Sequence, residues 1–119
     1  MYDEHDQLDH ELARLADSLR SSRNLLACLQ LAEFAFKLEH CIHSEESAFS
    51  AASGRLARPG PLAKVKTEHA SLRRLISAIA IAIDQSDERR GLELVSKLRS
   101  VLLLHLAKEE RLRDVQSIA

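Results

Sequence analysis

Apolar side chains recur along this chain every three or four residues, the spacing that places them on one face of an amphipathic helix. The first segment shows the pattern at Leu8, Leu12, Leu15 and Leu19. Later segments repeat it at Leu31, Ala35, Leu38, Ile42 and Phe49, at Val65, Leu72, Ile76, Ile79 and Ile83, and at Leu94, Leu98, Val101 and Leu112. The hydrophobic pattern therefore predicts an all-α protein.

Three polar stretches interrupt this pattern. Residues 53–61 contain two glycines and two prolines, residues 84–91 are polar and end in Gly91, and residues 21–24 offer Ser22 and Asn24 as helix caps. These breaks predict helices over 3–20, 24–52, 62–84 and 88–115. Because short connections favour antiparallel neighbours, we expect one domain over residues 1–119, an up-down-up-down four-helix bundle.

The second predicted helix is apolar around more of its circumference than the others. Leu25, Leu29 and Phe36 form a second stripe, and Phe34 also lies off the Leu31 stripe. This surplus leaves two readings open, a homo-oligomer interface or a broad contact with the core.

Composition narrows the classes of partner. The chain has 119 residues, a net charge of −1, 3% aromatic residues and no Trp, which argues against nucleic-acid or anionic-membrane binding. Residues 101–107 form the longest apolar run, too short to span a bilayer, and the N-terminus lacks a signal-peptide pattern. Cys28 and Cys41 are not a C-x-x-C pair, so we expect reduced cysteines in a cytoplasmic protein.

Histidines fall on the inward faces of three predicted helices. His5 extends the Leu8 stripe, His69 lies within the third stripe, and His105 lies within the fourth, with Glu109 one turn later. A buried carboxylate must be paired, protonated or bound to a metal. Since helix bundles hold iron or manganese with imidazoles and carboxylates from facing helices, this pattern predicts a metal site.

The second predicted helix adds the ligand-rich stretch LEHCIHSEES, residues 38–47. Glu39, His43 and Glu46 lie within roughly 60° of one another on an ideal helix, which favours His43 with Glu46 as ligands. The alternative pair, His40 with Glu45, requires a local π-bulge. With these residues the ligand set is four His and two Glu, a complement for two metal ions with positions open for a small ligand. Three further carboxylates are candidates to orient imidazoles: Glu4, Glu68 and Glu110.

In order along the chain, the motifs EHDQL, HCIHSEESAF, EHASL and HLAKEERL resemble the hemerythrin-like (HHE cation-binding) domains. The resemblance covers nearly the whole chain. It implies an antiparallel four-helix bundle around two non-haem irons with bridging carboxylates and an oxo or hydroxo bridge. Members of that family bind or sense dioxygen, respond to nitric oxide or redox state, store iron, or help repair iron centres.

Position by position, the resemblance implies His5, His69 and His105 as ligands and Glu109 as a bridging carboxylate. The sequence departs from the family pattern at two points. Arg73 replaces the second His of H-x-x-x-H on the third helix, and Cys41 stands where H-x-x-x-E-E requires His on the second. The chain thus resembles the divergent four-His, two-Glu members more than the oxygen carriers, and a thiolate ligand is a further alternative.

Three functions compete. The first is a non-haem, di-iron domain that binds or senses dioxygen or another small diatomic ligand, or changes redox state. The second is an oxidase, peroxidase or nitric-oxide-related enzyme at the same iron, for which the sequence supplies no general base besides the ligands. The third is a metal-free interaction or phosphotransfer module with His69 as phosphoacceptor beside Lys64 and Lys66, which the inward position of His69 disfavours.

Overall fold

The computed structural model describes the backbone of residues 2–56 and 60–118, and the side chains of residues 6–48, 50–51, 63–105 and 107. Its four helices are α1 (Tyr2–Arg20), α2 (Asn24–Leu56), α3 (Gly60–Asp84) and α4 (Glu88–Ile118). Within the described ranges there is no strand, which confirms the all-α prediction. No helix in this part of the chain is both long enough and apolar enough to cross a bilayer.

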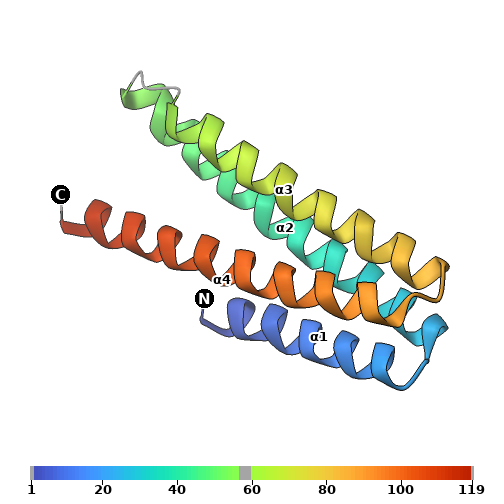
Figure 1. Cartoon of the computed structure of the whole chain (residues 1–119). Helices are drawn as coiled ribbons and strands as arrows, with labels where there is room; N and C mark the ends of the chain where they lie inside the picture. The colour runs from blue at the N-terminus through green and yellow to red at the C-terminus, as the bar shows by residue number, and fades with distance from the viewer. Residues whose placement is uncertain (1, 57–59, 119) are drawn as a thin grey trace.

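The four helices form a closed ring of neighbours. Helix α1 packs against α2, α2 against α3, α3 against α4, and α4 against α1. Consecutive helices run in opposite directions, and the α1–α2 and α3–α4 connections lie together at one end of the bundle, away from both chain ends (Figure 1). The predicted four-helix bundle is therefore confirmed, with extents of 49 × 23 × 19 Å.

The α1–α2 and α3–α4 connections use the same helix-ending motif. Ser22 and Ser86 adopt positive φ values of 57° and 56°. After each, the next backbone N–H donates to a carbonyl five residues back, Arg23 to Ser18 and Asp87 to Ala82. This Schellman pattern satisfies the last carbonyls of α1 and α3. The Asn24 side-chain amide donates to Ser86 Oγ at 3.0 Å and so joins the two connections.

Helices α2 and α4 are longer than the sequence pattern indicates. The expected end of the second helix is residue 52, whereas α2 continues to Leu56, and α4 continues to Ile118 rather than 115. An interior glycine such as Gly54 costs a helix only about 1 kcal/mol relative to Ala, which does not end it. Helix α3 begins at Gly60, with Pro61 in the first turn, where the missing N–H is not needed.

Where the structure describes their side chains, the stripes that the sequence predicts for α1, α3 and α4 line the core or pack against it, and the Leu112 side chain lies outside the described residues. Leu12, Leu72 and Leu98, one from each of these helices, have no exposed surface. In α2, Phe34 is buried at 1% exposure and joins the core, whereas Phe36 remains 77% exposed. Of the second α2 stripe, Leu25 and Leu29 are also exposed.

Ion pairs join neighbouring helices around this core. They are Asp9–Arg99 between α1 and α4, Glu11–Lys37 between α1 and α2, and Glu39–Arg73 between α2 and α3. Partly exposed pairs of this kind contribute at most about 1 kcal/mol each. Their role is to match helix neighbours, while the apolar core supplies most of the stability.

Candidate metal centre

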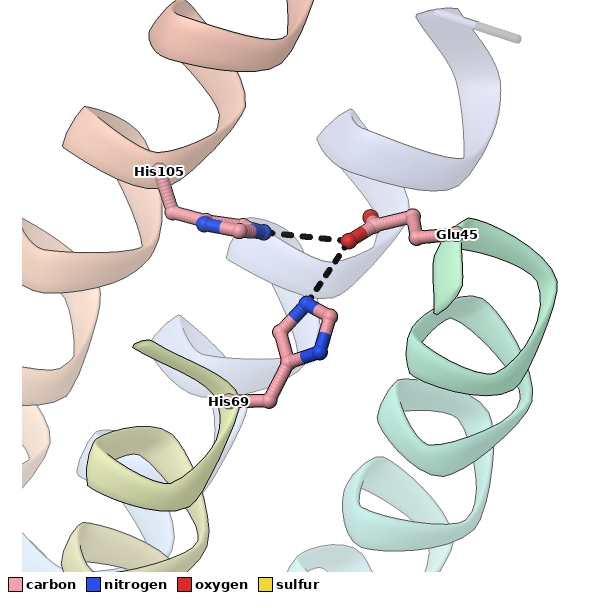
Figure 2. A group of neighbouring side chains, drawn as sticks. All are labelled: Glu45, His69 and His105. Atoms are coloured by element: carbon pink, nitrogen blue, oxygen red, sulfur yellow. Dashed lines mark hydrogen bonds and ion pairs between the residues drawn. The ribbon is translucent and has the colours of Figure 1, made fainter. Parts of the chain in front are cut away.

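Two buried imidazoles and one carboxylate converge between α2, α3 and α4. His69 Nε2 lies 2.8 Å and His105 Nε2 lies 3.1 Å from the same atom, Oε2 of Glu45. Figure 2 shows both rings directed at this carboxylate, with His69 on α3, His105 on α4 and Glu45 on α2. The ring centroids are 5.1 Å apart and the ring planes meet at 71°.

The far nitrogen of each ring also meets a carboxylate. His69 Nδ1 lies 3.0 Å from Glu46 Oε1, and His105 Nδ1 lies 2.6 Å from Glu68 Oε2. Each imidazole is thus held between two carboxylates, at 0% exposure for His69 and 6% for His105. Such contacts fix the orientation of both rings.

This arrangement has more hydrogen-bond acceptors than the rings can serve when neutral. A neutral imidazole carries one N–H, yet each ring faces carboxylate oxygens at both nitrogens. Burial lowers the pKa of His69, but its hydrogen bonds with Glu45 and Glu46 outweigh this effect, and the net result is a raised pKa. Without a second proton on the ring, a lone pair on nitrogen faces a carboxylate oxygen, an arrangement that a cation between them relieves.

The donor geometry suits such a cation. One ligand atom each from Glu45, His69 and His105 lies within 4.8 Å of the others. Adjacent donors on an octahedral ion with bonds of about 2.1 Å lie about 3 Å apart, close to the two Glu45–imidazole distances. The carboxylates at the Nδ1 atoms keep the proton on that nitrogen and leave Nε2 as the ligand atom, as in the carboxylate–histidine pairs of known metal sites. The residues therefore fit a metal ion.

The remaining predicted ligands of α2 lie elsewhere. His43 and His40 are exposed and are not part of the converging group. Glu39 accepts two hydrogen bonds from Arg73, from Nε at 2.6 Å and from an Nη atom at 3.0 Å. This salt bridge uses the position where the family pattern has its second third-helix His. The side chains of His5 and Glu109 lie outside the described residues.

Two carboxylate roles differ from the roles considered from sequence alone. Glu46, favoured there as a ligand, lies behind His69 at Nδ1, while Glu45 from the alternative pair faces both rings. Glu68 precedes His69 in sequence but contacts His105 on the neighbouring helix. For Glu45 and Glu46 the sequence signal was their adjacency, because residues about 100° apart on a helix reach different sides of an imidazole that packs between them.

Comparison with known protein families identifies the family of this chain. No curated protein and no solved structure matches the chain. The model of the Hemerythrin HHE cation binding domain matches residues 1–112, which include α1, α2, α3, the part of α4 up to residue 112 and every residue of the converging group. The chain belongs to the hemerythrin HHE cation-binding domain family.

Proposed function

We propose that this protein binds iron through Glu45, His69 and His105, and that dioxygen or another small diatomic ligand occupies a coordination position that these residues leave open. One observation carries the proposal, the convergence of two buried imidazole nitrogens on one carboxylate oxygen. Family membership supports a cation at this site.

Iron is the metal that suits both the donor set and the proposed role. Imidazole together with carboxylate binds iron in both of its common oxidation states. Bound iron would supply a redox-active centre with room for an exogenous ligand. The protein contributes orientation through Glu46 and Glu68, and a site from which the burial of His69 and His105 excludes bulk water.

We further propose a second iron beside the first, as in a di-iron centre. The candidates for its ligands are His5 on α1 and Glu109 on α4. The ligands of the first ion come from α2, α3 and α4 alone. Iron content per chain therefore separates one bound ion from two.

The first experiment is the iron content of protein expressed with added iron, measured by elemental analysis. We expect about two irons per chain in the wild type and a strong loss in His69→Gln and His105→Gln. His10→Gln is the matched control, because His10 is an exposed histidine of α1. An iron-free but folded wild type, or equal iron in all of these variants, would exclude the site. His43→Gln tests the second-helix histidine favoured from sequence, and we expect it to keep its iron because His43 is exposed.

The second experiment concerns the small ligand. Iron-loaded protein is reduced without oxygen, and its absorption spectrum is recorded before and after exposure to dioxygen or nitric oxide. A spectral change that reverses when the gas is removed supports reversible binding. An unchanged spectrum with iron present would refute the small-ligand role and leave iron binding intact.

A further inference from the structure

A groove of about 580 Å³ runs between α3 and α4 and ends at the candidate metal centre. Its volume is that of a small-molecule site. Leu72, Leu75, Val101 and Leu104 line its apolar part, and Glu68 and His105 lie at one end. Leu104 is 65% exposed, so the groove presents an uncovered apolar side chain.

Basic side chains line the groove away from the metal centre. Arg74, Lys97 and Arg90 are exposed lining residues, against one lining carboxylate, Glu68. Among the described residues neither Arg74 nor Lys97 forms an ion pair, and Arg90 has only a 4.0 Å contact with Glu93. The basic side chains therefore favour an anion at their end of the groove, and Glu68 disfavours an anion at the end beside the metal centre.

We propose that this groove binds a small organic anion with an apolar chain, of the medium-chain fatty-acid class. Its carboxylate lies between Arg74 and Lys97, and its chain extends over Leu75, Val101 and Leu104 toward the metal centre.

The helix register supports this orientation. The contact between Glu68 and His105 aligns α3 with α4 at one level. From there, Arg74 is six residues along α3 and Lys97 is eight residues along antiparallel α4, roughly 9 and 12 Å away at 1.5 Å per residue. The two cations thus lie at similar heights on opposite walls, and the distance to His105 suits an extended chain of medium length.

Glu68 connects the groove to the metal centre. It lines the groove and contacts Nδ1 of His105. A chain that reaches Glu68 alters the environment of that contact, so occupancy of the groove and iron affinity influence each other reciprocally. This coupling rests on the proposed iron site, whereas anion binding in the groove does not depend on iron.

The test is calorimetric titration of metal-free protein with octanoate at low salt, with octanamide as the uncharged comparison. We expect saturable octanoate binding, about tenfold tighter than octanamide because charge-assisted hydrogen bonds are lost with the amide. The double variant Arg74→Met, Lys97→Met keeps the apolar stems and is expected to bind octanoate about tenfold more weakly. Arg14→Met, at an exposed position of α1, is the matched control.

Three results would overturn the proposal. They are no saturable binding, equal binding by the double variant and the control when circular dichroism shows both folded, and a dimer that Leu104→Ser converts to monomer while octanoate does not bind. The last result assigns the groove to a second copy of the chain. A separate titration with ferrous iron, with and without octanoate, tests the coupling, for which we expect at least about a twofold change in affinity. A protein that binds octanoate but no iron contradicts only the iron site.

Discussion

Replacing Glu46 with Gln tests how strongly the carboxylate behind His69 supports metal binding. Glu46 Oε1 lies 3.0 Å from His69 Nδ1, and the Glu46 side chain is 25% exposed. When a cation is bound at Nε2, the imidazole proton stays on Nδ1, and this N–H donates a hydrogen bond to Glu46. Gln preserves the shape and an acceptor oxygen but removes the negative charge.

The size of the effect follows from the difference between two kinds of hydrogen bond. A hydrogen bond to a charged group contributes about 1.5–3 kcal/mol and one between neutral groups about 0.5–1.5 kcal/mol. The difference is about 1 kcal/mol, and the partial exposure of Glu46 keeps it near this lower end. Since 1.4 kcal/mol corresponds to tenfold, we expect Glu46→Gln to raise the Kd for ferrous iron by about five- to tenfold.

The assay is competition for ferrous iron with a chromophoric chelator in the absence of oxygen. Glu93→Gln is the matched control, because it removes a carboxylate of α4 that is 59% exposed and pairs only loosely with Arg89 and Arg90. Glu68→Gln provides the corresponding test at His105. A Kd for Glu46→Gln equal to that of Glu93→Gln would refute the reasoning that this carboxylate supports the ligand.

Three further predictions concern pH and stability. His69 has a raised pKa in the folded metal-free protein, so its charged form stabilises the fold below the unfolded pKa of about 6.5, and this contribution is lost as pH rises through the folded value. Urea unfolding with chelator should therefore show the stability advantage of wild type over His69→Gln shrinking with rising pH, and an advantage that grows would contradict this. Gly91→Ala should raise the free energy of unfolding by about 1 kcal/mol. The added Cβ meets Leu19 at 3.4 and 3.6 Å, an ordinary contact, and a lower melting temperature would show that the helix cannot accept it. Phe34→Ala should cost about 3–5 kcal/mol in urea unfolding, against less than about 0.5 kcal/mol for the exposed Phe36→Ala. A loss for Phe34→Ala as small as that for Phe36→Ala would place the Phe34 ring outside the core.

The helices could be predicted from the sequence because the patterns that indicate them are local. Hydrophobic spacing and the polar breaks at residues 21–24 and 84–91 report on backbone preferences of a few neighbouring residues. The breaks agree with the serines that end α1 and α3 in left-handed conformation. The end of α2 was predicted too early, at residue 52 instead of Leu56, because a single glycine weakens a helix without ending it.

The candidate metal centre could be predicted only in part from the sequence. His69 and His105 lie on strongly apolar stripes, so their inward direction follows from spacing alone, and both are buried. On α2 the spacing left Glu45 and Glu46 unresolved, because both lie near the boundary of the buried face. For the same reason Phe34 and Phe36 looked alike in sequence, yet only Phe34 is buried.

The amino-acid sequence by itself determined four amphipathic helices, their order, and two histidines that face the core, because each of these depends on periodicity within one helix. Only the tertiary structure decided that Glu45 faces both imidazoles, that Glu46 and Glu68 hold the opposite nitrogens, and that Arg73 pairs with Glu39. These contacts depend on how far each helix is rotated and shifted against its neighbours. That arrangement is set by packing over the whole core, which no single segment encodes.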